Sequence, residues 1–342
     1  MNNIPLVVIL YDSITNSVFE SQVVIPLIRK HSVHTPITII SFEKKPIPQE
    51  ILSRITTTYP TITLLILKRF PLVNTINLYI DSLRVKKILR PYKHNKYTLQ
   101  ARGPLAGFIA LAAYNLPHCT TIIIQARSLL AEEYRFSNPT MSLVARYRYW
   151  LFKSIETAVY QKQKKSVIIE AVSPALQKYL IETYSTPASS ITIAEHDTPT
   201  PIQTEQIHDW RLAVRSELNI SETSFVYCYN GSIKPWQQPE QVIEFFTEEQ
   251  KKIATIFLLI LTQDTEKFIQ LLQAAHLAPK NYCVLSVAHQ NIYRYLAASD
   301  AGIIFREPDI VNWTSRPTKV LEYQAVGLKI IHNNTVGMLV EA

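Results

Sequence analysis

Residues 314–331 read TSRPTKVLEYQAVGLKII, and this stretch decides how the second half of the chain is interpreted. Pro317 suits the first turn of a helix, because its missing N–H is a donor that no helical hydrogen bond would use. Ser315 or Thr314 would cap the free donors of that turn, and Gly327 fits the left-handed stop position. The sequence therefore predicts a short helix over these residues.

The position and charges of this helix indicate a binding site. The strand-like run AGIIFRE, residues 301–307, precedes it, so the helix begins at the carboxyl edge of a sheet, where α/β proteins bind ligands. A helix N-terminus with Lys319 in its first turn attracts phosphate oxygens. Glu322 follows Lys319 by three residues and Thr318 by four, so the three share a face, and the carboxylate can accept hydrogen bonds from a ribose. The alternative is an ordinary surface pair of Lys319 and Glu322.

The rest of the chain repeats one pattern. Seven strand-like runs alternate with helical stretches, which include residues 16–31, 103–115 and 141–163, and this alternation predicts a parallel sheet covered on both faces. The stretch AEHDTPTPIQTEQ, residues 194–206, interrupts the pattern and predicts a linker. Five further strand-like runs follow it. We expect two successive α/β units with a cleft between them, which suits a length of 342 residues.

Several classes of protein are disfavoured. The six glycines form neither a dinucleotide fingerprint nor a phosphate loop. Three cysteines without close spacing argue against structural zinc. The longest apolar runs fall short of a membrane span, and the N-terminal IPLVVIL reads as a strand rather than a signal peptide, so we expect a cytoplasmic protein.

Positive charge is concentrated in the first half of the chain. Residues 1–200 hold 23 Lys and Arg against 12 Asp and Glu, whereas residues 201–342 hold 12 against 15. This asymmetry indicates an anionic partner, and a solvated basic surface is the alternative. RNA is disfavoured because no recognised module accompanies the charge. The basic side chains of one region are Arg84, Lys86, Lys87, Arg90, Lys93 and Lys96.

A second basic region, RYRYWLFK at residues 146–153, interleaves aromatic residues with Arg146, Arg148 and Lys153, as interfacial helices do. Contact with the inner face of an anionic membrane is therefore one expectation. The helical spacing of Tyr147, Trp150 and Leu151 favours a plain core face instead. These readings lead to opposite expectations about exposure.

The segment around Glu322 resembles the donor-binding run S-P-T-K-x-x-E-Y-x-A-x-G of GT-B glycosyltransferases related to family 4. Five other segments resemble that family in the same order: NSVFESQVVIPLIRKH, ITIISFEK, IIIQARSLLAEEY, VSPALQKYL and YNGSIKPWQ. The resemblance covers nearly the whole chain. It implies two Rossmann-like domains facing each other across a cleft, an acceptor-side domain at 1–200 and a nucleotide-sugar-binding domain at 201–342.

The resemblance also implies roles for single residues. Glu322 would bind the ribose of a nucleotide sugar, and Lys319 with the amides near Thr318 would face its diphosphate. Gly231 would let the backbone approach that diphosphate closely. The remaining donor-site residues implied are Ser232, Arg306 and Ser315. Arg127, at the end of a strand in the first domain, would contact sugar, phosphate or acceptor, and its alternative is an ion pair with Glu132 or Glu133.

The chain also departs from the family pattern. Thr314 stands where many relatives carry a first glutamate, and Gln237 where they often carry a phosphate-binding lysine. In the segment of Arg127, Gln125 replaces an aspartate and Ser128 a glycine. Relatives usually continue through further helices beyond IHNNTVGMLVEA.

Together these features predict an enzyme that transfers a sugar from a nucleoside diphosphate to a hydroxyl of a glycan or lipid-linked acceptor. No Asp-x-Asp pair is present to hold a divalent ion, so transfer without metal or cofactor is expected, and the resemblance implies retention at the anomeric carbon. His118 and His196 lie in predicted loops, where neither makes a convincing base. The alternatives are a related epimerase, for which acid and base groups are not apparent, and a degenerate relative that binds a nucleotide sugar or a partner enzyme without turnover.

Overall fold

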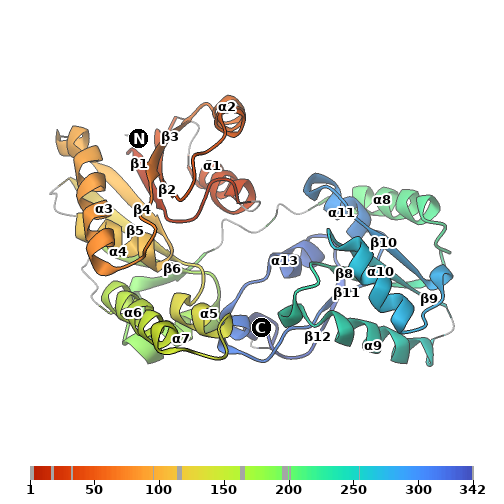
Figure 1. Cartoon of the computed structure of the whole chain (residues 1–342). Coiled ribbons are helices and arrows are strands. Elements are labelled where there is room, and N and C mark those ends of the chain that lie inside the picture. Colours follow the sequence, from red (N-terminus) through yellow and green to blue (C-terminus); the bar gives the residue numbers. More distant parts are fainter. Residues whose placement is uncertain are drawn as a thin grey trace. The chain divides into compact units, whose positions relative to one another are not determined.

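The computed structural model describes residues 4–16, 19–31, 34–94, 96–113, 118–161, 166–194, 199, 202–253 and 255–340 (Figure 1). The chain divides into two compact units, Met1–Asp197 and Thr198–Ala342. Each unit is an α/β layer structure with its own parallel sheet.

The first unit contains a seven-stranded sheet in the order β3-β2-β1-β4-β5-β6-β7, and all its strands pair in parallel. All seven predicted strands are confirmed. Every residue of the interior strand β1 is buried, as expected for a parallel sheet covered on both faces. The strands are β1 (Leu6–Leu10), β2 (Ile37–Glu43), β3 (Ile62–Lys68), β4 (Tyr97–Arg102), β5 (Cys119–Ala126), β6 (Val167–Ala171) and β7 (Ile191–Ile193).

Helices cover both faces of this sheet. A short π-helix (Glu20–Val24) continues into α1 (Ile25–Lys30), and α1 and α2 (Gln49–Thr58) pack on one face over an apolar core that includes Leu6, Val8 and Leu10. On the other face α4 packs between α3 and α6 (Figure 1). The bounds of the remaining helices are α3 (Thr75–Ile88), α4 (Gly103–Ala113), α5 (Leu130–Phe136), α6 (Leu143–Tyr160) and α7 (Pro174–Tyr184), with single 3₁₀ turns at Arg90–His94 and Ala188–Ser190.

The second unit contains a five-stranded parallel sheet in the order β10-β9-β8-β11-β12. All five predicted strands are confirmed here as well. They are β8 (Phe225–Asn230), β9 (Ile256–Leu261), β10 (Tyr282–Leu285), β11 (Ala301–Ile304) and β12 (Lys329–His332). The helices are α8 (Thr204–Glu217), α9 (Pro239–Gln250), α10 (Thr265–Ala274), α11 (Ile292–Leu296), α12 (Ile310–Thr314), α13 (Thr318–Ala325) and α14 (Gly337–Val340), with 3₁₀ turns at Pro235–Gln237, Pro279–Asn281 and His289–Asn291.

Alternation along β8 separates the two cores of the second unit. Tyr227 and Tyr229 pack with α9 and α10, whereas Val226 and Cys228 pack with α11 and α13. This two-residue period is the usual consequence of the pleat. One boundary was predicted wrongly, because α8 begins at Thr204, inside the stretch interpreted as a linker.

The exposed face of α6 contradicts the prediction of a plain core face. Tyr147 is 60% and Trp150 63% exposed, and only Leu151 is buried. Their helical spacing was correctly recognised, but the sequence does not show that α4 and α5 cover the opposite side of this helix. Within the described residues, no helix is both long enough and apolar enough to span a membrane.

Candidate functional site

The carboxyl ends of β8 and β11 and the start of α13 bring several predicted site residues together in the second unit. Gly231 directly follows β8, Arg306 is the second residue after β11, and Lys319 and Glu322 lie on α13. Because parallel strands end at the same edge of a sheet, residues from three distant segments meet here.

Glu322 is a buried carboxylate. It is 5% exposed, and its Oε2 accepts a hydrogen bond of 2.6 Å from Nδ2 of Asn230. Lys319 is 8% exposed, so an ordinary surface pair between these residues is the wrong interpretation. A buried carboxylate is costly unless hydrogen bonds compensate it, and Asn230 supplies one.

Lys319 is held by uncharged partners. Its Nζ donates to Oε1 of Gln237 at 2.7 Å and lies 4.6 Å from the centroid of the Tyr229 ring. Burial lowers the pKa of Lys319 well below its usual value, and the charge of Arg306 also lowers it, whereas Glu322 raises it. An anion at this position would favour the charged ammonium.

Arg306 adds a second cation to the same edge. Asn333 fixes its backbone, since its Oδ1 accepts from the Arg306 N–H at 3.2 Å and its Nδ2 donates to the Arg306 carbonyl at 2.8 Å. Burial lowers the pKa of Arg306. Its Nε atom is buried without a hydrogen-bond partner among the described residues. Because the charge of Arg306 lowers the pKa of Lys319, an anion near both cations would be favourable here.

Gly231 provides the space in which Lys319 lies. A Cβ at Gly231 would lie 2.5 Å from Nζ of Lys319 and 2.6 Å from Oε1 of Gln237. Close approach was the predicted reason for this glycine, and the structure shows that protein side chains approach it. Ser232 belongs to the same cluster, because its Oγ accepts from Nε2 of Gln237 at 2.8 Å.

The start of α13 differs from the prediction. Pro317 is the N-cap rather than the first helical residue, and no side chain caps the helix. Ser315 and Thr314 instead donate to carbonyls of the preceding helix, those of Asn312 and Ile310, both at 2.8 Å. Thr318 begins the helix with an exposed side chain. Gly327 is in the left-handed region with φ +72°, as predicted.

Three members of the cluster were not predicted as binding residues: Asn230, Gln237 and Tyr229. Asn230 has a usable signal, because a polar residue directly before a glycine at the end of a buried strand lies at the ligand edge. Tyr229 reads as an ordinary strand residue. Gln237 ends the 3₁₀ turn Pro235–Gln237, and its contact with Lys319, 82 residues further along the chain, depends on the tertiary fold.

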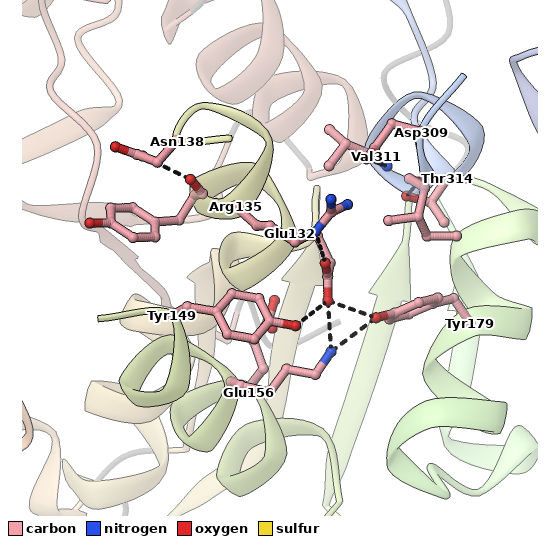
Figure 2. A network of polar contacts seen from close by, with 12 residues as sticks. Glu132, Arg135, Asn138, Tyr149, Glu156, Tyr179, Asp309, Val311 and Thr314 are labelled. Atoms are coloured by element: carbon pink, nitrogen blue, oxygen red, sulfur yellow. Dashed lines mark hydrogen bonds and ion pairs between the residues drawn. The ribbon is translucent and has the colours of Figure 1, made fainter. Parts of the chain in front are cut away.

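Arg127 lies in the first unit and lines a pocket there with Gln125 and Glu170. The carboxylate of Glu132 binds Arg135 through Oε2 at 2.9 Å, and its Oε1 accepts from Tyr149 at 2.9 Å and Lys153 at 3.2 Å (Figure 2). His118 precedes β5, at the opposite edge of the sheet from the carboxyl ends. His196 and the side chain of Lys93 lie outside the described residues.

No family model matches the sequence, and a search of curated proteins finds no significant similarity. Solved structures do resemble the chain. A glycosyltransferase from Rickettsia africae aligns with 99% of this chain and 81% of its own at a TM-score of 0.65 and 12% identity. WaaG, a glycosyltransferase involved in lipopolysaccharide biosynthesis, aligns with 98% of this chain and 83% of its own at a TM-score of 0.62 and 14% identity. HepE from Anabaena, solved with UDP and glucose, aligns with 99% of this chain and 83% of its own at a TM-score of 0.62 and 12% identity.

The chain has the GT-B fold. Its two parallel sheets of seven and five strands correspond to the two Rossmann-like domains of these structures, so the predicted fold class is confirmed. In such sheets ligands bind beyond the carboxyl ends of the strands, which is where Lys319, Glu322 and Arg306 lie. Fold similarity at this level of identity establishes the architecture, and the residues of the site must carry the functional argument.

Proposed function

We propose that this GT-B protein is a glycosyltransferase that moves a sugar from a nucleoside-diphosphate donor to a hydroxyl acceptor. One observation carries the proposal: a buried carboxylate, Glu322, lies on the same short helix as a buried lysine, next to Arg306, at the ligand edge of the second sheet. The carboxylate suits ribose hydroxyls, and the two cations suit a diphosphate.

The chemistry follows from this charge distribution. The bond between the anomeric carbon and the phosphate oxygen breaks, a bond to the acceptor oxygen forms, and the acceptor proton passes to the departing diphosphate. Lys319 and Arg306 would neutralise the negative charge that develops on the diphosphate. We propose transfer without a metal ion and with retention at the anomeric carbon. The lack of an Asp-x-Asp pair in the sequence supports the first point, and the family resemblance supports the second.

The solved neighbours support the choice of donor. HepE is described in complex with UDP and glucose and in complex with UDP-glucose. A donor of the same chemical class fits the cation and carboxylate pattern of this site. The neighbours WaaG and WaaB are named for lipopolysaccharide synthesis, which supports a cell-envelope glycan or glycolipid as acceptor.

Binding and turnover can be tested separately. The melting temperature of the protein is measured with UDP, GDP and ADP. Hydrolysis of UDP-, GDP- and ADP-sugars is measured separately, with the released nucleotide as the readout. At least one nucleotide should raise the melting temperature. Glu322→Gln should weaken the binding of that nucleotide by about 1–3 kcal/mol, because charge-assisted hydrogen bonds are lost. The control Glu266→Gln changes an exposed carboxylate on α10 and should bind normally. Equal affinity of Glu322→Gln and wild type would refute the ribose role.

A binding protein without turnover is the second candidate, and the observation that favours it is Thr314. This residue stands where many relatives carry a glutamate, it is 2% exposed, and its hydroxyl donates to the Ile310 carbonyl inside α12. A nucleotide that raises the melting temperature, combined with no hydrolysis or transfer from its sugars, would support this candidate over the enzyme.

We further propose peripheral contact with an anionic membrane through the first unit. On α3 the side chains of Ile76, Tyr79, Ile80 and Leu83 form an exposed stripe at helical spacing, with exposures of 70%, 56%, 38% and 48%. Exposed Lys87 and Arg90 follow this stripe. Apolar side chains beside exposed cations are the combination that binds anionic lipid surfaces.

The N-terminal half of α6 offers a similar surface. Tyr147 and Trp150 are exposed with ring centroids 6.3 Å apart, and the neighbouring Arg146 and Arg148 are exposed as well. Of the predicted basic residues, Lys153 is engaged with Glu132 and Arg84 with Asp81, so neither is free for lipid.

Sedimentation with phosphatidylglycerol vesicles tests this contact. The double variant Tyr147→Ser/Trp150→Ser should bind less than wild type, whereas Leu212→Ser, an exposed apolar residue of α8, should bind equally. Binding should also fall as salt rises. Wild-type protein that stays in the supernatant with these vesicles at low salt would refute the membrane proposal.

A further inference from the structure

The strands β8 and β11 part from each other at their carboxyl ends, beside the candidate site. Among the residues that the structure describes they pair at two positions, Tyr227 with Ala301 and Cys228 with Gly302. β8 nevertheless runs on to Asn230 and β11 to Ile304. A ladder continued in the same register would join the N–H of Asn230 directly to the carbonyl of Ile303. Because buried backbone groups need hydrogen-bond partners, something else must serve these two.

The hydroxyl of Tyr323 serves both groups. It accepts from the N–H of Asn230 at 3.0 Å and donates to the carbonyl of Ile303 at 3.2 Å, so it lies between the two groups that the ladder would join. Tyr323 is 0% exposed and belongs to α13, which packs against β11 (Figure 1). Its ring lies over Gly302, where a Cβ would be 2.5 Å from a ring carbon. The glycine therefore leaves room for the ring to reach this position.

Asn230 connects this hydroxyl to the carboxylate of the candidate site. Its N–H donates to the Tyr323 hydroxyl, and its side-chain Nδ2 donates to Oε2 of Glu322 at 2.6 Å. Glu322 and Tyr323 are neighbours on α13, so this helix supplies both the carboxylate and the hydroxyl that fixes the donor of the carboxylate. Hydrogen bonds linked in this way are coupled, and a shift of Asn230 would change the orientation of Glu322.

We propose that Tyr323 is a positioning residue of the nucleotide site: its hydroxyl keeps β8 and β11 apart, and Asn230, held there, orients the Glu322 carboxylate toward the ribose. The inference rests on the proposed function, because the ribose role of Glu322 belongs to it. Without the hydroxyl, the N–H of Asn230 and the carbonyl of Ile303 can bond to each other, which closes the strands and moves Asn230 away from its present position.

The diphosphate half of the site does not depend on this hydroxyl. Nζ of Lys319 is held by Gln237, and the backbone of Arg306 is held by Asn333. Loss of the Tyr323 hydroxyl should therefore impair recognition of the ribose and leave recognition of the diphosphate unchanged. A general loss of stability would weaken both.

Calorimetry separates these two parts of the ligand. The probes are whichever of UDP, GDP and ADP raises the melting temperature most, its 2′-deoxy and 3′-deoxy forms, and pyrophosphate. Wild-type protein should bind the ribonucleotide at least about tenfold more tightly than one of the deoxy forms, since a charge-assisted hydrogen bond is lost. In Tyr323→Phe this ratio should fall to about threefold or less, with unchanged affinity for pyrophosphate. The variant should fold, because phenylalanine keeps the ring that packs over Gly302.

Two further variants distinguish positioning from stability. Tyr227→Phe removes another buried hydroxyl of the second unit, which donates to Glu249 at 2.8 Å, and should lower the melting temperature without changing the ratio. Asn230→Ala removes the donor to Glu322 and should lower the ratio by itself. Adding Tyr323→Phe to Asn230→Ala should lower the ratio no further, because the hydroxyl acts through Asn230.

Three results would overturn the inference while the nucleotide site stands. The first is a wild-type ratio in Tyr323→Phe, the second is an equal loss of affinity for pyrophosphate and nucleotide, and the third is an additive effect in the double variant. Wild-type protein that binds a nucleotide without preferring its ribose form would refute the ribose role of Glu322 and the inference together. Wild-type protein that binds none of UDP, GDP and ADP would refute the proposed function itself.

Discussion

Glu156 on α6 makes the stability of the first unit depend on pH. The residue is 0% exposed, and its Oε2 accepts from the Tyr184 hydroxyl at 2.8 Å, while Oε1 has no hydrogen-bond partner among the described residues. Burial raises the pKa of Glu156 from 4.5 to about 7, although the hydrogen bond from Tyr184 and the charge of Lys153 lower it. The folded protein therefore binds this proton more tightly than the unfolded chain does.

The sign of the effect follows from proton linkage. Between pH 4.5 and about 7 the folded protein carries the proton and the unfolded chain does not, so the free energy of unfolding falls as pH rises. Each pH unit is worth about 1.4 kcal/mol, so the full effect is about 3 kcal/mol. Above pH 7 both states are ionised at this residue, and the contribution stays constant.

Glu156→Gln removes this titration while keeping the shape of the side chain. Urea denaturation at pH 5, 6, 7 and 8, followed by circular dichroism, measures the free energy of unfolding of each protein. The free energy of unfolding of the variant, relative to that of wild type, should rise by about 1.4 kcal/mol per pH unit from pH 5 to 7. Above pH 7 the difference between the two proteins should stay constant. Glu182→Gln on α7 changes an exposed carboxylate and should show no such trend. A constant difference between Glu156→Gln and wild type at all four pH values would refute the reasoning.

Three further predictions concern the second unit. Gly231→Ala places a Cβ within 2.5 Å of Nζ of Lys319, the flexible end of a side chain, so the fold should remain while affinity for UDP, read by calorimetry, falls about tenfold. Lys319→Met removes a buried cation and should leave the melting temperature unchanged or raised, with the response to UDP lost. Gly302→Ala places a Cβ 2.5 Å from the ring of Tyr323, whose hydroxyl is fixed by hydrogen bonds to Asn230 and Ile303, and should cost about 1–3 kcal/mol in urea denaturation. Unchanged UDP affinity in the first two variants, or unchanged stability in the third, would contradict the respective argument.

The strands could be predicted from the sequence because buried parallel strands leave a strong local signal. IFLLIL of β9 is buried at every residue, and no amphipathic helix has that composition. Helix starts were less accurate. Pro317 is the N-cap of α13, one residue from the predicted position, since the same local pattern is compatible with either placement. The π-helix at Glu20–Val24 has no sequence signal of its own.

The exposure of single side chains and the residues that they contact could not be predicted, because both depend on residues distant in the chain. Trp150 has the spacing of a core residue and lies on the outer face of α6. Gln100 reads as one polar residue in the strand YTLQA, and only the position of α1 turns it into the wall of a pocket. The sequence could place Arg306, Lys319 and Glu322 near one edge of a sheet, because Arg306 closely follows a strand and the other two lie on a short helix after it, where such sheets bind ligands.

Gln237 departs from the family pattern and leaves the candidate site with two cations instead of three. A lysine at this position, as many relatives are expected to carry, would bring a third cation toward the buried Lys319 and Arg306, whose charges already oppose each other. The amide oxygen of Gln237 instead accepts from Lys319 at 2.7 Å, and its Nε2 donates to Ser232 at 2.8 Å. The site thus keeps two cations, oriented by a neutral bridge. Thr314 has no such compensation, because its hydroxyl donates within α12, and the charge of a glutamate there is simply missing. Loss of turnover would therefore be explained by Thr314 rather than by Gln237, and nucleotide binding should survive in either case.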